Sequence, residues 1–337
     1  MPYRLLALTI AAIPATAIAQ LATPNWDQVD AGVKAICKRV GRPKPPAADR
    51  PSAAQIKALR GCDSEKLYYG EGVKPDYRKA RQCAFAEAQA GDAPVFHGDT
   101  ILMQVYANGF GVKRDPDLAT AYACGIDGAP MEIAGRISHL QSLKTKPDSF
   151  DYCDDITSGW GAGACEARDS KTEAAARNKR LNALLVKLPP AARPLYAAAK
   201  RSFDAFVDAH GDGEVDLTGT LRAADVIAEQ DHVRDQFLKD LERLISNRWP
   251  VATPTDAKST DTLLNASYRK ALAWAAGKDN SSTIMGEAIR KTQRAWLIYR
   301  DAYVRFAAAA APQISADAVR TSLSRLRTAQ LDQLSSS

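Results

Sequence analysis

Large hydrophobic side chains recur at helical spacing near the end of the chain. In "QRAWLIYRDAYVRF", residues 293–306, four rings lie three, four and three residues apart: Trp296, Tyr299, Tyr303 and Phe306. At about 100° per residue these positions form one narrow stripe. The opposite side of the same helix is polar: Arg290, Arg294, Asp301 and Arg305. Alternation of threes and fours suits helix packing, so we expect the rings to be core residues and not a ligand platform. We expect the arginine side to be solvated surface and not a polyanion site.

The same stripe occurs one hundred residues earlier, at these positions: Tyr196, Ala199, Phe203 and Phe206. Upstream of it, "RLNALLVKL" (180–188) echoes "LLNASYRKAL" (263–272). Downstream, "DHVRDQFLKDL" echoes "DAVRTSLSRL". Three matched segments in the same order predict two tandem helical-bundle modules, residues 148–246 and 258–337.

A different repeat occupies the N-terminal half. "LYYGEGVKPDYRKARQCAFAEAQAG" (67–91) returns as "VYANGFGVKRDPDLATAYACGIDGA" (105–129), with Gly72 aligned to Gly111 and a period of 39 residues. A period in the range 20–50 indicates stacked supersecondary units. Each copy reads as helix, glycine-rich turn, helix, and Asp76 and Asp115 stand where an N-cap would open the second helix.

Residues 61–128 resemble Sel1-like repeats, relatives of the tetratricopeptide family, through a Tyr, a Gly-x-Gly-Val turn and a Lys-Ala pair. The resemblance implies a right-handed helical stack that serves protein contacts. Two repeats are fewer than a free-standing solenoid needs, so we expect this segment to pack on the rest of the chain.

The first residues are typical of a secretory signal peptide. Arg4 supplies the positive start, residues 5–13 are apolar, and Ala17-Ile18-Ala19 is an A-x-A site that predicts cleavage after Ala19. Residues 20–60 follow as one helix and a proline-rich linker, "GRPKPPAADRPSAA". No later stretch approaches the roughly 20 apolar residues of a membrane span. We therefore expect a protein of the periplasm or the exterior.

Composition supports an all-α fold, because Ala dominates the apolar share and aromatic residues make up only 7% of the chain.

The six cysteines all lie in the N-terminal half: Cys37, Cys62, Cys83, Cys124, Cys153 and Cys165. An oxidising compartment favours disulfides, and no C-x-x-C or zinc-ligand spacing occurs. Cys62 and Cys83 flank Gly72 at similar distances, and Cys153 and Cys165 enclose a short loop. Cys37 and Cys124 then remain, although spacing alone cannot choose among about fifteen connectivities.

The net charge of +6 is mild for 337 residues and is no nucleic-acid footprint, although it could favour weak contact with anionic polymers. Of the four histidines, His97, His139, His210 and His232, the third lies in "DAHGDGEVDLTG", which lacks the ligand order of a calcium loop. We expect a solvated loop there, fixed by hydrogen bonds of Glu214 and Thr220.

Acid–base chemistry has one candidate region. Asp154, Asp155 and Glu166 lie near Trp160, and a sugar hydrolase would need two carboxylates at a defined separation. An Asp-Asp pair in a cysteine-closed loop is equally consistent with a rigid turn. Ser158 lacks a G-x-S-x-G context, and residues 159–163 lack the Lys-Ser/Thr of a phosphate loop.

The C-terminal module resembles the lysozyme-inhibitor LprI-like family of exported bacterial proteins. The resemblance is carried by "LLNASYRKAL" and "IRKTQRAWLIYRDAY", in which the recognisable residues are Leu264, Asn265, Gln293, Arg294, Trp296, Tyr299, Arg300 and Asp301. The first module resembles longer members through "FDYCDDITSGWGAGAC" and "EVDLTGTLRAA".

The resemblance implies an exported, non-enzymatic module that binds another protein, a lysozyme-like muramidase, and needs neither cofactor nor metal. One electrostatic obstacle is that many lysozymes are cationic, as is this chain. Two alternatives stay open: an envelope scaffold that engages partners through the Sel1-like repeats, and an enzyme that uses Asp154 and Asp155. The oligomeric state cannot be predicted from the sequence.

Overall fold

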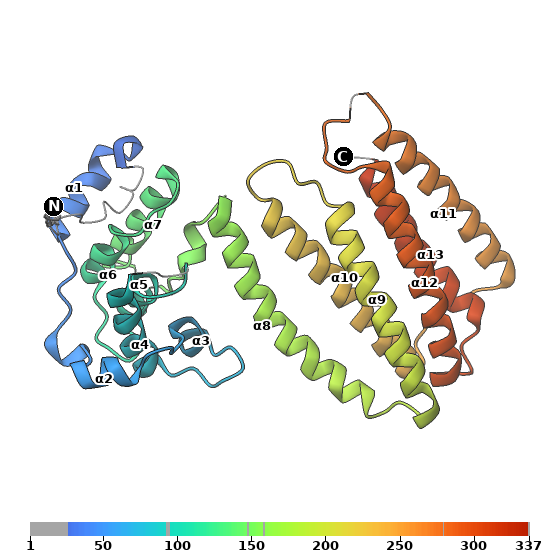
Figure 1. Cartoon of the computed structure of the whole chain (residues 1–337), viewed down its shortest axis with the longest axis horizontal. Coiled ribbons are helices and arrows are strands. Elements are labelled where there is room, and N and C mark those ends of the chain that lie inside the picture. The colour runs from blue at the N-terminus through green and yellow to red at the C-terminus, as the bar shows by residue number, and fades with distance from the viewer. Residues whose placement is uncertain (1–25, 92–94, 147, 158, 279, 336–337) are drawn as a thin grey trace, which may run out of the picture. The chain divides into compact units, whose positions relative to one another are not determined.

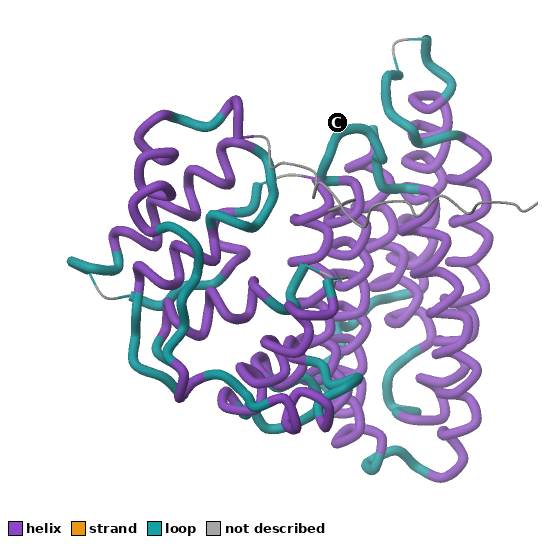
Figure 2. Tube along the Cα trace, turned by 60° about the vertical axis from the view of Figure 1, so that its left-hand side comes forward, coloured by secondary structure: helices purple, strands orange, loops and turns teal. Residues whose placement is uncertain are grey.

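The computed structural model describes residues 26–91, 95–146, 148–157, 159–278 and 280–335 (Figure 1). Over these residues the protein contains thirteen α-helices and four short 3-10 segments, and no strand is present in this part of the chain (Figure 2). The all-α prediction is confirmed. The predicted signal peptide, residues 1–19, lies outside the described residues, as does Ser158.

The chain divides into two compact units. The first comprises the residues up to 64 together with 77–155, and the second comprises 65–76 together with 156–337. The division falls inside α3 (Ser64–Tyr69) and directly before the long helix α8. None of the described helices is long and apolar enough to span a bilayer.

The first unit is a series of short helices: α1 (Ala31–Val40), α2 (Ala53–Ala58), α4 (Tyr77–Ala90), α5 (Asp99–Asn108), α6 (Pro116–Ala123) and α7 (Pro130–Ser142). From α4 to α7 each helix packs on the next one along the chain. The Tyr106 and Tyr122 rings stack with centroids 6.0 Å apart, and both are buried. Packing between successive helices is what the 39-residue repeat predicts.

The two glycine-rich turns agree in individual hydrogen bonds. Four of their glycines have positive φ, a conformation that costs glycine least: Gly70, Gly72, Gly109 and Gly111. The Asp76 N–H donates to the Leu67 carbonyl, and the Asp115 N–H donates to the Tyr106 carbonyl, both over 2.9 Å. The Asp115 carboxylate also accepts from the Leu118 N–H at 2.9 Å, which is the expected N-cap. The repeated sequence therefore builds a repeated turn.

Two disulfides hold the first unit together. Cys62 bonds Cys83 with a Cα–Cα distance of 5.9 Å, and Cys37 bonds Cys124 with a Cα–Cα distance of 5.8 Å. The second bond joins α1 to the end of α6. Cys153 and Cys165 are disulfide-bonded as well, and no described cysteine is free. These are the pairings expected from the spacing and, for Cys37 and Cys124, from elimination.

The second unit is built from six longer helices: α8 (Gly159–Leu185), α9 (Arg193–Gly213), α10 (Arg222–Ile245), α11 (Pro254–Ala275), α12 (Gly286–Ala310) and α13 (Ala316–Leu334). In this unit α8 packs on α10, α9 on α12 and α11 on α13 (Figure 1). One hydrophobic core includes residues of both predicted modules. The parts of the modules 148–246 and 258–337 that lie in this unit therefore share a core and do not each enclose their own.

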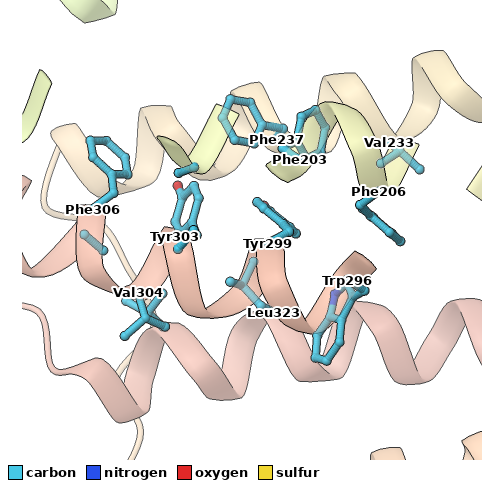
Figure 3. Packing of buried hydrophobic residues seen from close by; sticks show 14 of the residues in the cluster. Phe203, Phe206, Val233, Phe237, Trp296, Tyr299, Tyr303, Val304, Phe306 and Leu323 are labelled. Carbon is cyan, nitrogen blue, oxygen red and sulfur yellow. The ribbon is translucent and has the colours of Figure 1, made fainter. Parts of the chain in front are cut away.

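The two aromatic stripes form the centre of this core and run antiparallel (Figure 3). Tyr196 contacts Phe306 with ring centroids 5.5 Å apart. Phe206 stacks on Tyr299 at 5.9 Å with the rings nearly parallel. Tyr303 has no exposed surface. The rings are core residues, as their spacing predicts.

Candidate functional site

A groove opens on the second unit. We call it the α10–α13 groove, because residues of these helices and of α9 and α12 line it. It has a wide part of about 610 Å³ and a narrow part of about 300 Å³, which share four lining residues: Glu229, His232, Gln330 and Gln333. These volumes lie within the range of about 300–1,000 Å³ that is usual for ligand pockets.

Acidic side chains dominate the wide part. Four carboxylates line it: Glu214, Asp216, Asp225 and Glu229. His210, His232 and several amide and hydroxyl side chains complete the wall, and no lysine or arginine is among the described residues that form it. Glu214 and Glu229 are paired with cationic side chains described below, so Asp216 and Asp225 give the wide part its net negative charge, which attracts positive charge.

A buried ion pair lies beneath the groove. Arg327 of α13 donates from Nη1 to Glu214 Oε2 at 2.7 Å and from Nη2 to Oε1 at 2.6 Å. Neither side chain has exposed surface. The Arg327 Nε also donates to the Gln293 Oε1 of α12 at 2.9 Å. Burial alone would raise the pKa of Glu214, but the charge and hydrogen bonds of Arg327 hold it below its ordinary value.

His210 extends this network to α10. Its Nδ1 lies 2.8 Å from Glu214 Oε2 and its Nε2 lies 2.9 Å from Glu229 Oε1. Burial alone would lower the pKa of His210, but the hydrogen bonds to the two carboxylates raise it above the ordinary value. Ionised carboxylates only accept, so both ring nitrogens donate and the ring is cationic. The two positive charges of Arg327 and His210 then balance the two negative charges of Glu214 and Glu229.

The narrow part contains one further acid. Asp240 of α10 is 3% exposed, and its Oδ1 accepts from Gln236 Nε2 at 3.0 Å and from Arg243 Nη1 at 3.4 Å. Burial raises the pKa of Asp240 to about 6, and the bonds from Gln236 and Arg243 offset this only in part. Rings from three helices surround the cavity: Phe203, Phe206, Phe237, Trp296 and Tyr299 (Figure 3). Two of these, Trp296 and Tyr299, belong to the stripe that we expected to be core and not a ligand platform.

The family-motif residues fall into three groups: residues of the hydrophobic core, one residue that binds Arg327, and residues near the surface. Leu264, Trp296 and Tyr299 are buried in the core, and Gln293 holds Arg327. The remaining motif residues lie toward the outside: Asn265, Arg294, Arg300 and Asp301. The Arg300 Nη1 lies 3.4 Å from Asp261 Oδ1, and its guanidinium lies 5.1 Å from the Trp296 ring centre. Most of the motif therefore fixes α11, α12 and α13 together.

Asp154 and Asp155 have local partners in the 3-10 turn Tyr152–Asp155. The Asp154 Oδ2 accepts from the Asp151 N–H at 2.9 Å, and Asp155 Oδ2 lies 3.1 Å from His139 Nδ1. Neither aspartate lines the α10–α13 groove. Among the described residues, no cluster of three side chains with metal-ligand spacing lies in the groove either.

The sequence interpretation passed over the groove's central residues. Arg327 follows Leu323 by four positions and precedes Leu331 by four, so it occupies the apolar stripe of α13. Asp240 does the same in α10, three residues after the buried Phe237. A charged residue inside an apolar stripe is the signal that could have identified both, because buried charges require partners.

Comparison with protein families identifies one region of the chain. Residues 252–334 match a family model described as "Lysozyme inhibitor LprI". The match spans α11, α12 and α13, and it therefore includes Trp296, Tyr299 and Arg327 of the groove. No curated protein and no solved structure matches the chain. The resemblance stated for the C-terminal module is confirmed over these residues.

Proposed function

We propose that this protein is a lysozyme inhibitor-like binding protein of an extracytoplasmic compartment, and that its α10–α13 groove holds a cationic muramidase. The family match over residues 252–334 supports the class of function. The disulfides support the compartment, because such bonds persist where the surroundings are oxidising. The acidic wide part of the groove is the observation that carries the choice of surface.

The distribution of charge removes the electrostatic obstacle. Residues 252–334 hold twelve Lys and Arg against seven Asp and Glu, which accounts for most of the net charge of +6. Exposed members of this set lie on α12 and do not line the groove: Arg290, Lys291, Arg294 and Arg305. Local potential steers association, so an acidic groove attracts a basic partner although the chain as a whole is cationic.

Binding is better supported than catalysis in this groove. Glu214 and Glu229 occupy both nitrogens of His210, so neither nitrogen is left to take a proton from a substrate. Glu214 itself is held by both terminal nitrogens of Arg327. These groups form a fixed, internally paired cluster beneath the groove, and among the described residues of the wall the unpaired carboxylates are Asp216 and Asp225.

A lysis assay tests the proposal directly. The purified protein is added to a cationic muramidase, and the clearing of a cell-wall suspension is followed with and without it. We expect inhibition that weakens as salt is raised, since exposed charge pairs are screened over about 8–10 Å at physiological salt. A muramidase of acidic pI serves as the control and should be inhibited at least tenfold less. Equal inhibition of both enzymes, or of neither at low salt, would exclude the acidic groove as the docking surface.

The envelope-scaffold alternative is supported by the two repeated glycine-rich turns. Gly72 and Gly111 have nearly equal φ values, +67° and +70°, which is consistent with a stack of repeated helical units. Capture of a partner that survives charge-removing substitutions in the groove would favour this role over inhibition.

A further inference from the structure

The narrow part of the groove holds a carboxylate whose charge is incompletely matched. Both hydrogen bonds to Asp240 reach Oδ1, and Oδ2 has no hydrogen-bond partner among the described residues. The ion-pair partner of Asp240 is Arg243, whose side chain is 51% exposed, so solvent weakens this 3.4 Å contact. Buried carboxylates are normally paired, so an unpaired oxygen facing a cavity indicates a missing positive partner.

No lysine or arginine among the described residues that line the groove is available to Asp240. Arg327 also lines the narrow part, but its terminal nitrogens are bound to Glu214. His210 is held between Glu214 and Glu229. Neither Arg327 nor His210 can therefore meet Asp240 Oδ2, which leaves this oxygen open to a cation of another molecule.

The walls beside Asp240 favour a cation with an apolar stem. Phe203 and Phe237 stack with centroids 4.3 Å apart, and Tyr299 meets Phe203 edge-on at 5.1 Å. Aromatic faces attract ammonium and guanidinium groups. The rings are only 2–4% exposed, so only small parts of them face the cavity. They do not present the open flat face on which a sugar would stack. A volume of about 300 Å³ is at the lower end for ligand pockets, which suits a single side chain.

We propose that the narrow part of the α10–α13 groove is a socket for one basic side chain of the partner protein. Its guanidinium or ammonium group donates to Asp240 Oδ2, and its aliphatic stem lies against Phe237 and Tyr299, whose rings contact each other with centroids 6.3 Å apart. This inference rests on the proposed function, because it specifies which chemical group of a cationic muramidase the groove receives. It adds an anchor at the centre of an otherwise electrostatic contact.

Two small probes test the socket without any muramidase. N-acetyl-L-argininamide carries the guanidinium, and N-acetyl-L-citrullinamide replaces it by an uncharged urea of the same shape. Each is titrated into the full-length protein and followed by NMR chemical shifts. We expect saturable binding of the argininamide and at least tenfold weaker binding of the citrullinamide. Equal binding of the two, or no binding of either, would overturn the socket.

Asp240→Asn is the decisive variant, and Asp225→Asn is its matched control. Both remove one negative charge from the groove, but Asp225 is exposed and lines only the wide part. We expect Asp240→Asn to weaken argininamide binding and muramidase inhibition at least tenfold, and Asp225→Asn to change argininamide binding less than twofold.

Inhibition unaffected by Asp240→Asn would overturn the socket and leave the inhibitor proposal standing. Argininamide binding through Asp240 without any inhibition of a muramidase would overturn the inhibitor proposal and leave the socket standing. If Asp240→Asn does not fold, the comparison of the two probes on the unmodified protein decides.

Discussion

Arg327 donates two hydrogen bonds to Glu214, a residue 113 positions earlier in the chain, and neither side chain is exposed. The pair joins α13 to the residue that follows α9. Through Gln293 and His210 it also involves α12 and reaches α10. A buried pair seldom adds much stability over apolar residues, but it fixes geometry, since each charge is costly without the other. Here it fixes the four helices that line the groove.

Removing only one member of this pair should be strongly destabilising. We expect Arg327→Met to lower the free energy of unfolding by about 3–5 kcal/mol, because it leaves Glu214 buried and uncompensated. The double variant Arg327→Met/Glu214→Gln should recover at least half of that loss. Urea unfolding followed by circular dichroism measures both. Arg325→Met, an exposed position on the same helix, is the control and should change little. An additive double variant would show that the two side chains do not compensate each other.

Stability should depend on pH through His210. Its folded pKa lies above the ordinary 6.5, so its stabilising contribution is complete below about pH 6.5 and is lost as pH rises through the folded pKa. The groups that face it are Glu214, Glu229 and, more weakly, Arg327. We expect the difference in unfolding free energy between the unmodified protein and His210→Gln to shrink above pH 6.5. One proton limits the slope to about 1.4 kcal/mol per pH unit. Parallel stability curves from pH 6 to 9 would contradict this role.

Asp240 should reduce stability at neutral pH. Its folded pKa of about 6 exceeds the ordinary 3.8, so the folded state binds the proton more tightly than the unfolded state between these values. Stability therefore falls as pH rises from 4 to 6. We expect Asp240→Asn to raise the free energy of unfolding at pH 7 by up to about 3 kcal/mol, and the gain to vanish near pH 4. Urea titrations of both proteins at the two pH values measure it. A variant that is less stable at pH 7 would show that the carboxylate is fully compensated in the fold.

The hydrophobic pattern predicted much of the second unit, but not its assembly. The spacing of Trp296, Tyr299 and Tyr303 identifies a buried helix face, yet periodicity cannot say which helix covers that face. The answer is the matching stripe around Phe203, which lies antiparallel to it. For this reason two sequence-similar modules form one core.

The groove was harder to predict than the helices. Its charged residues are separated by up to 113 positions, as Arg327 and Glu214 are, and only the fold brings them together. The "DAHGDGEVDLTG" segment was expected to be a solvated loop. Its first half instead completes α9, which ends at Gly213, and His210 and Glu214 are buried. The pattern failed there because each of these polar residues is paired with a distant one, which local spacing cannot reveal.

The close approach of α9 and α12 should depend on a small residue in each helix. A Cβ added at Gly213 would lie 2.9 Å from the Ala288 Cβ and 3.5 Å from Thr292 Oγ1, so Gly213→Ala requires the helices to separate. Such overpacking costs about 1–3 kcal/mol, and the better helix propensity of Ala returns at most about 1 kcal/mol. We therefore expect a net loss of unfolding free energy in Gly213→Ala.

In the Gly213→Ala background, Ala288→Gly should restore stability, although Ala288→Gly alone should be destabilising because it leaves a space and weakens α12. A double-variant cycle in urea measures this coupling, and strict additivity would show that the two positions do not touch. Because Gly213 directly precedes Glu214, a separation there should also weaken inhibition of a cationic muramidase, and Ala288→Gly should restore inhibition together with stability.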